Sequence, residues 1–251
     1  MTATAAVPVI ASWPEPEGIA PRGTVVVVPG RGEHPRTYER FGRRIAADGY
    51  RVWAVSDPLV DESRTINQIH RFLAAAADDE IGPRPRVLVG SDSGALFVAG
   101  LAARGVPGIA GIVLAGLPIA GEEPVERDWA DEVEARTACP THQRVLTTDD
   151  AFRRAALAER LPATWFAQAR AAEIAVPVLG LHGEADPVSP LDSVRPWYAD
   201  VPSAELVGIA SGRHDALNDQ THRTAAATIV LFLERLRIGA DAPAIAREVA
   251  L

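Results

Sequence analysis

The sequence contains no lysine and only one cysteine, Cys139, among its 251 residues. A single cysteine excludes an internal disulfide framework and fits a reducing compartment, so we expect a cytoplasmic protein. Its basic residues are scattered arginines, and the formal net charge is −8. An acidic chain without a basic cluster is not expected to bind nucleic acid or an anionic membrane surface.

Long apolar runs are also missing, since none approaches the ~20 residues that a membrane-spanning helix requires. Residues 1–10 carry no basic segment before their short apolar stretch, so we expect no secretory signal peptide. The histidines lack the mutual spacing of metal ligands, and the glycines at 30 and 32 match no phosphate-binding loop. We therefore expect no membrane partner, no metal and no cofactor, and a small molecule as the substrate.

What the sequence does contain is a repeated alternation of short apolar runs with amphipathic stretches. Buried strands are predicted at 25–28, 52–55, 87–89, 112–114, 178–181 and 206–209. Helical periodicity is found at 36–48, 66–73, 95–103 and 219–236. This alternation predicts a single α/β domain over residues 1–251, with a mostly parallel sheet covered by helices on both faces. The stretch 8–21, rich in proline and glycine, is expected to add one or two edge strands.

One segment, residues 117–175, interrupts the alternation and is called the cap segment below. It holds a charged stretch and two short helical patterns, near 149–160 and 163–173. An insertion between two late strands of such a sheet lies over the strand ends, where ligands bind. We predict a helical cap in which Trp129 and Trp165 contact the substrate. The alternative is that these tryptophans only pack the cap onto the core.

The most informative motif spans residues 87–95 and reads Val-Leu-Val-Gly-Ser-Asp-Ser-Gly-Ala. An apolar strand enters a sharp turn between small residues, which is the pattern of a nucleophile elbow. Gly90 and Gly94 occupy the small positions when Asp92 is at the tip. An aspartate there can attack carbon and form an ester with the enzyme. Two alternatives stay open: Ser93 at the tip of a shifted turn, or an Asp92 that only caps the following helix.

Polar residues follow three other predicted strands. The run 30–34, Gly-Arg-Gly-Glu-His, follows the first of them, and its backbone N–H groups are expected to face a substrate oxygen, with Gly30 contacting the substrate. Asp186 comes soon after the fifth strand, and His214 comes soon after the sixth. Ligands bind at the carboxyl ends of the strands in such sheets. A nucleophile, an acid and a base are therefore expected at one edge of the sheet.

From about residue 22 to 237, the chain resembles the α/β-hydrolase fold superfamily, whose triad order matches Asp92, Asp186 and His214. The runs 30–34 and 213–219 are similar to the monoacylglycerol lipase and lysophospholipase group, although proline stands where that group begins its first motif with histidine.

An aspartate at the elbow instead resembles epoxide hydrolases and haloalkane dehalogenases. Other marks of those enzymes are missing. The cap segment contains no tyrosine that would protonate an epoxide oxygen, and Ser93 stands where dehalogenases commonly carry tryptophan.

The resemblance implies a cofactor-free hydrolase acting on a small apolar organic molecule through an Asp-His-Asp triad. Asp92 would attack, His214 would activate water, and Asp186 would orient the imidazole. The backbone N–H groups of Arg31 and Ser93 would form the oxyanion hole. Three alternatives stay open: an esterase, lipase or thioesterase that uses Ser93, a lyase or cyclase with Asp92 and His214 as acid and base, and a pseudo-enzyme that binds a small ligand.

Overall fold

The computed structural model describes residues 10–74, 84–121 and 124–246, and these build one seven-stranded sheet in the order β1-β3-β2-β4-β5-β6-β7. The strands are β1 (Ala11–Trp13), β2 (Gly23–Val28), β3 (Tyr50–Ala54), β4 (Arg86–Ser91), β5 (Gly111–Ala115), β6 (Val178–Gly183) and β7 (Ala204–Ile209). Neighbouring strands are parallel except β1, which pairs antiparallel with β3. The prediction of a mostly parallel sheet is confirmed, and the N-terminal stretch contributes one edge strand.

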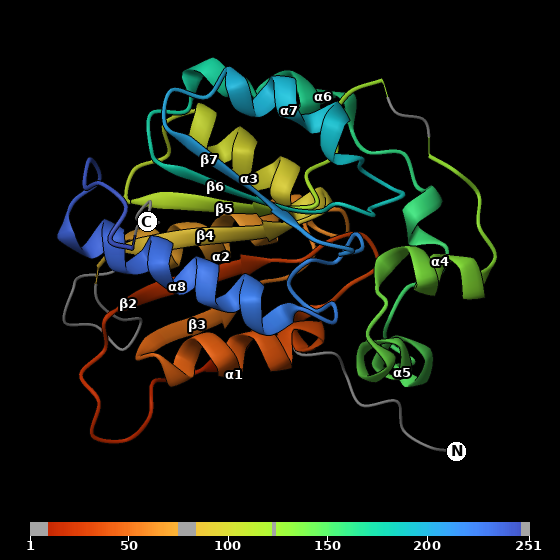
Figure 1. Cartoon of the computed structure of the whole chain (residues 1–251), viewed down its shortest axis with the longest axis horizontal. Helices are drawn as coiled ribbons and strands as arrows, with labels where there is room; N and C mark the ends of the chain where they lie inside the picture. The colour runs from red at the N-terminus through yellow and green to blue at the C-terminus, as the bar shows by residue number, and fades with distance from the viewer. Residues whose placement is uncertain (1–9, 75–83, 122–123, 247–251) are drawn as a thin grey trace, which may run out of the picture.

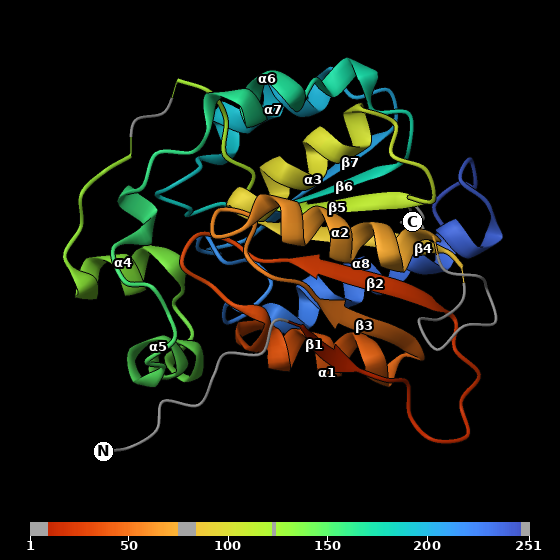
Figure 2. The same ribbon diagram turned by 180° about the vertical axis from the view of Figure 1, so that it is seen from behind.

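Helices cover both faces of the sheet, as predicted. Helices α1 (Glu39–Ala47) and α8 (His222–Ile238) lie on one face, while α2 (Glu62–Ala74), α3 (Ser93–Ala103) and α7 (Leu191–Ala199) lie on the other (Figures 1 and 2). A short 3₁₀ helix, η1 (Pro35–Tyr38), leads into α1. The sequence did not predict α7, because Pro196 lies inside it and breaks the helical pattern. No helix in the described ranges is long and apolar enough to cross a bilayer.

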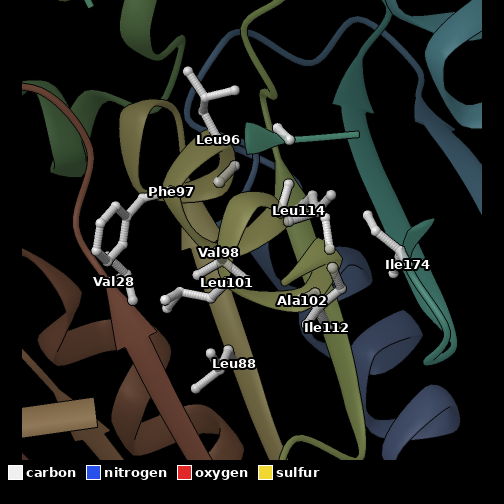
Figure 3. Packing of buried hydrophobic residues seen from close by; sticks show 14 of the residues in the cluster. Val28, Leu88, Leu96, Phe97, Val98, Leu101, Ala102, Ile112, Leu114 and Ile174 are labelled. Carbon is white, nitrogen blue, oxygen red and sulfur yellow. The ribbon is translucent and has the colours of Figure 1, made fainter. Parts of the chain in front are cut away.

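The core explains why the central strands are apolar along their whole length. Every residue of β2 is buried, with Val25 and Val27 in the cluster beneath α1 and α8, and Val26 and Val28 in the cluster beneath α2 and α3. Helix α3 is buried on all sides, since the sheet lies beneath it and the cap segment covers its outer side. Figure 3 shows its apolar side chains packed against those of β2, β4 and β5. This packing fixes the start of α3, where the elbow lies.

The cap segment is helical and runs between β5 and β6. It contains α4 (Trp129–Arg136), α5 (Pro140–Thr148), η2 (Ala156–Ala158), α6 (Ala163–Gln168) and η3 (Ala171–Glu173). Helices α4 and α5 lie beyond the carboxyl ends of the strands, whereas α6 packs on α3 (Figures 1 and 2).

Two sequence expectations within the cap segment are corrected. The pattern near 149–160 gives only the single turn η2, because Ala155 adopts the left-handed conformation (φ 61°) and ends any regular helix there. Helices α4 and α5 were not predicted. The high charge of α4 masked its buried face, which contains Val133 and Ala135 but also the charged residues Glu132 and Arg136.

Candidate active site

Asp92 occupies the tip of the turn between β4 and α3. Its backbone has φ 48° and ψ −120°, a strained conformation for a residue with a side chain. The Asp92 N–H donates to Ala115 O on β5 at 2.9 Å, which ties the turn to the sheet. The Asp92 side chain makes no capping hydrogen bond to α3, and Ser93 is already the first residue of that helix. The backbone thus presents the carboxylate of Asp92, not the hydroxyl of Ser93, at the tip.

The small residues on either side of Asp92 are required by close backbone contacts. A Cβ atom on Gly90 would lie 2.4 Å from Gly94 O, and one on Gly94 would lie 2.2 Å from Val28 O. Both distances are far below van der Waals contact, and both contacted atoms belong to the backbone. The turn therefore accepts only glycine at these two positions.

We predict that Gly94→Ala destabilises the protein by at least about 3 kcal/mol, at the upper end of overpacking costs, because backbone atoms cannot swing aside. Gly100→Ala in the same helix is the matched control, since its Cβ would come no closer than 3.4 Å to Gln168, the residue that supplies its nearest neighbouring atoms. It should change stability by no more than about 1 kcal/mol. Urea unfolding of the two variants compares them directly, and equal stabilities would contradict this account of the elbow.

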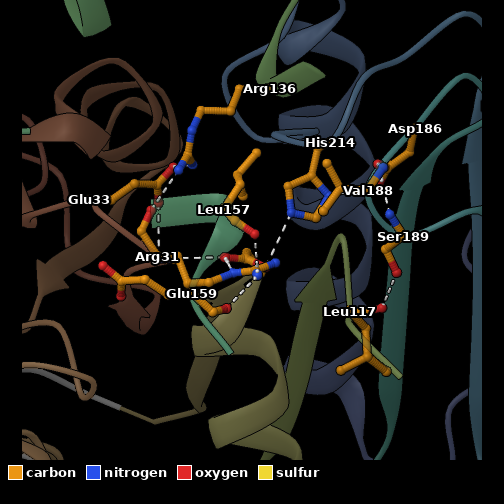
Figure 4. Close-up of polar contacts among 12 residues, drawn as sticks. Arg31, Glu33, Leu117, Arg136, Leu157, Glu159, Asp186, Val188, Ser189 and His214 are labelled. Atoms are coloured by element: carbon orange, nitrogen blue, oxygen red, sulfur yellow. Dashed lines mark hydrogen bonds and ion pairs between the residues drawn. The ribbon is translucent and has the colours of Figure 1, made fainter. Parts of the chain in front are cut away.

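His214 lies between two carboxylates at the carboxyl ends of the strands. Its Nδ1 is 2.8 Å from Asp186 Oδ2, and its Nε2 is 3.2 Å from Asp92 Oδ1. The N–H at Nε2 is not directed closely enough at Asp92 to make a hydrogen bond, and no other described residue accepts it. Asp186 is itself fixed, because its Oδ1 accepts the backbone N–H groups of Val188 and Ser189 at 2.8 and 3.0 Å (Figure 4). The structure thus brings together the three residues predicted as a triad.

The Arg31 side chain forms a bidentate ion pair with Asp92, a contact that the sequence analysis did not predict. Its Nε donates to Asp92 Oδ2 at 2.8 Å, and its Nη2 donates to Oδ1 at 2.8 Å. The Arg31 backbone N–H, predicted as an oxyanion-hole donor, also donates to Oδ2, at 2.9 Å. A charge at the buried elbow requires a nearby opposite charge. Arg31, an arginine in the loop after β2, was the feature of the sequence that could have indicated this contact.

The charges of this site balance one another. Burial alone would raise the pKa of Asp92, but the charge and hydrogen bonds of Arg31, together with the neighbouring His214 imidazole, hold that pKa well below its ordinary value. Burial likewise disfavours a charged imidazole, yet Asp186 and then Asp92 raise the pKa of His214 to about 10. At neutral pH the resting site therefore contains an ionised Asp92 beside one guanidinium and one imidazolium.

Ser93 lies beside this cluster without joining it. Its side chain is fully buried, and its Oγ has no hydrogen-bond partner among the residues that the structure describes. A serine nucleophile requires a neighbouring base to take its proton. His214, protonated and directed toward two carboxylates, does not provide that contact.

A cavity of about 500 Å³ has Arg31 in its wall, whereas the buried Asp92 and His214 are not among the residues that line it. The rest of the wall comes mainly from the loop after β5 and from the cap segment, and includes Pro118, Ile119, Leu157, Leu161, Phe166 and Val188. Most of these side chains are apolar. Gly30 does not reach the wall. It lies behind Asp92, where a Cβ would be 3.0 Å from Asp92 Cβ.

The expectation that Trp129 and Trp165 line this cavity is not met. Trp165 is 2% exposed, and its ring packs 4.9 Å from that of Phe97 on α3. Its indole N–H donates to Glu62 on α2 at 3.1 Å. Trp129 packs against Phe152 within the cap segment, with ring centroids 5.7 Å apart. Both tryptophans make packing contacts, Trp129 lines a separate cavity of about 510 Å³, and Phe166 is the cap aromatic in the wall of the cavity beside Arg31.

The sequence matches a known family over most of its length. Residues 25–229 fit the model of the alpha/beta hydrolase family, and the chain therefore belongs to that family. No curated protein matches the chain significantly.

Solved structures agree on the fold. A soluble variant of monoglyceride lipase from Saccharomyces cerevisiae is 17% identical, with a TM-score of 0.72 over 90% of this chain and 91% of its own. Monoacylglycerol lipase from Paleococcus ferrophilus is 18% identical, with a TM-score of 0.69 over 89% and 97%. A thioesterase domain from the curacin biosynthetic pathway is 20% identical, with a TM-score of 0.59 over 90% and 94%.

Proposed function

We propose that this protein is a cofactor-free hydrolase that uses the Asp92 carboxylate as its nucleophile on a small, mostly apolar substrate. Membership of the alpha/beta hydrolase family supports hydrolysis. The observation that carries the proposal is an ionised Asp92 at the tip of the elbow, with His214 3.2 Å away and Asp186 behind the imidazole.

The two oxygens of Asp92 have different surroundings, which favours attack by one of them. Oδ2 accepts two N–H groups of Arg31, whereas Oδ1 accepts only one. Each carboxylate oxygen offers about two lone pairs, so Oδ1 keeps one for a substrate. In the first step a bond forms between Oδ1 and the substrate carbon. The bond from that carbon to the leaving group breaks, and the leaving group takes the electron pair.

The second step needs a base, and the first step generates it. Once Asp92 is an ester it carries no charge, so one of the two carboxylates that raise the pKa of His214 is gone. His214 then gives its proton to the leaving group or to solvent, and the neutral imidazole takes a proton from water. That water attacks Cγ of Asp92 and the Cγ–Oδ1 bond breaks, so that the product alcohol leaves with Oδ1 and takes the proton of the imidazolium. The new carboxyl group of Asp92 then gives its proton to His214, and Asp186 stabilises the imidazolium that forms again.

The chemistry of the nucleophile narrows the substrate class. A carboxylate that attacks a carbonyl gives a reactive anhydride, whereas attack on a saturated carbon gives a stable ester that the enzyme can hydrolyse in a controlled second step. An epoxide, an alkyl halide or a similar electrophile is therefore the expected substrate. The apolar cavity beside Arg31, of about 500 Å³, suits a molecule of this kind.

A single-turnover reaction in water enriched in oxygen-18 tests the mechanism. The substrate panel contains styrene oxide, 1-bromohexane and a short-chain aryl ester, and enzyme is in excess over each. Because the product takes its oxygen from Asp92, the first-turnover alcohol should be unlabelled, and the peptide containing Asp92 should gain the heavy oxygen. Labelled product with an unlabelled peptide would mean that water attacks the substrate directly. Turnover of the aryl ester alone would favour a serine mechanism.

A further inference from the structure

We propose that Arg136 and Glu132, in cap helix α4, are positioning residues that hold Arg31 on Asp92. This inference rests on the proposed function, in which Arg31 keeps Asp92 ionised and leaves one lone pair of Oδ1 available. In the part of the chain that the structure describes, neither residue lines the cavity and neither contacts Asp92. Their effect on the reaction is therefore exerted through Arg31.

A closed ring of hydrogen bonds carries the inference. Arg31 Nη1 donates to Leu157 O at 2.9 Å, and the Leu157 N–H donates to Glu132 Oε1 at 3.4 Å. Arg136 donates to that same oxygen from Nη2 at 2.7 Å and from Nε at 3.1 Å. Arg136 Nη2 also donates to Arg31 O at 2.9 Å, and this bond closes the ring. Both the guanidinium and the carbonyl of Arg31 are thus held by one ring of hydrogen bonds through the cap segment.

The same turn of α4 also holds the loop that carries His214. Ala135 O accepts the His214 N–H at 3.3 Å, and Arg136 O accepts the Asp215 N–H at 2.8 Å. The Arg31 loop and the His214 loop come from opposite ends of the chain, and α4 contacts both. The last turn of α4 therefore fixes the position of Arg31, which binds Asp92, relative to His214, which acts on the ester.

Stability alone does not account for this pair. The Arg136 and Glu132 side chains are each 1% exposed, and taking such an ion pair out of water costs about as much as the pair returns. The other charged groups that face Arg136 are Glu33, whose Oε1 lies 3.8 Å from Nη1, and Asp215. A guanidinium that donates to both Glu132 Oε1 and Arg31 O makes a directional contact that an ammonium group cannot reproduce.

Arg136→Lys and Glu132→Gln test the proposal. Lysine keeps the charge but cannot reach both acceptors in one plane, and glutamine keeps an acceptor oxygen but loses its charge. For Arg136→Lys we expect kcat to fall about 100-fold, the size of effect that a misplacement near 1 Å produces, with KM changed less than about threefold. The acid limb of the kcat profile should move to higher pH, because the charge of Arg31 is the largest of the contributions that lower the pKa of Asp92, ahead of those of His214. Glu132→Gln should show the same changes in smaller measure.

Arg154→Lys is the matched control. Arg154, like Arg136, is a cap arginine whose guanidinium lies over an aromatic ring. The guanidinium carbon of Arg154 is 5.0 Å from the centre of the Trp129 ring, and that of Arg136 is 4.8 Å from the centre of the Phe152 ring. Among the described residues, Arg154 donates to Thr147 O and does not contact Arg31. It should leave kcat, KM and the acid limb unchanged. A lower melting temperature in Arg136→Lys with unchanged kcat and acid limb would overturn the proposal. If Arg136→Lys does not fold, Glu132→Gln decides by the same readouts.

A readout without turnover separates this proposal from the proposed function. The Nε-bound proton of Arg31 can be observed through its nitrogen-15 resonance, which is identified by its loss in Arg31→Lys. In the native protein this proton should exchange slowly with solvent. It should exchange much faster in Arg136→Lys and stay slow in Arg154→Lys. Faster exchange without any alkyl ester on Asp92 would refute the nucleophile and keep the positioning role. Slow exchange in Arg136→Lys would refute the positioning role alone.

Discussion

His214→Gln is expected to stop the reaction after its first chemical step, so that an alkyl ester accumulates on Asp92. The first step uses a carboxylate that is already ionised, and it needs no base. The second step needs one, and a positioned base contributes about 10²- to 10⁴-fold to such a reaction. Hydrolysis of the ester should slow by that factor while its formation continues.

The variant is incubated with excess styrene oxide or 1-bromohexane. Mass spectrometry of the intact protein should show the mass of one added alkyl group, and digestion should locate that mass on the peptide that contains Asp92. The matched control is His34→Gln. His34 is also paired with an aspartate, Asp149 at 2.7 Å, yet no recorded contact joins it to Asp92. That control should turn over normally and carry no adduct. An unmodified His214→Gln protein, with a substrate that the native protein hydrolyses, would exclude the covalent route.

Much of the fold follows from the sequence alone, because a buried parallel strand must be apolar along its whole length. All six predicted strands are present, within two residues at each end, and Val25–Val28 is the clearest example. The elbow is also visible, since the backbone approaches at Gly90 and Gly94 admit no other residue. These features depend on local sequence and on general packing rules.

The features that the sequence did not reveal depend on tertiary contacts. The Arg31 fork on Asp92 joins residues 61 positions apart, and nothing in either motif specifies where a long side chain will point. An aromatic residue in a cap has the same composition signal whether it lines a cavity or packs on a helix. Trp165 therefore could not be distinguished from Phe166 before the structure placed them.

The Arg31 fork gives a physical reason why an aspartate rather than a serine can be buried at the tip of this elbow. A neutral serine can be buried beside a histidine without any counter-charge. A buried carboxylate cannot, and this chain supplies a guanidinium directly over it, with both side chains no more than 5% exposed. The aspartate and the arginine are thus one unit, so a change at Asp92 also alters the surroundings of Arg31.

The pair Asp92→Asn and Ser93→Ala should give opposite results, and together they decide which residue is the nucleophile. Asparagine keeps the size of aspartate but lacks an ionised oxygen, so turnover should fall to background. It also leaves Arg31 without its counter-charge, and breaking a buried ion pair in this way costs about 3–5 kcal/mol. Activity must therefore be measured at a temperature where circular dichroism shows that Asp92→Asn is folded.

Ser93→Ala should keep most of the activity and at least the native stability. The hydroxyl that it removes is buried and has no hydrogen-bond partner among the described residues, so no contact is lost, and the backbone N–H remains. If Ser93 were the nucleophile the order would reverse, because a serine and its histidine act as a unit and losing either removes most of the rate. An inactive Ser93→Ala beside an active Asp92→Asn would restore a serine esterase. Equal activity in both would leave the site with binding or acid–base chemistry only, since neither oxygen would then form a bond to the substrate.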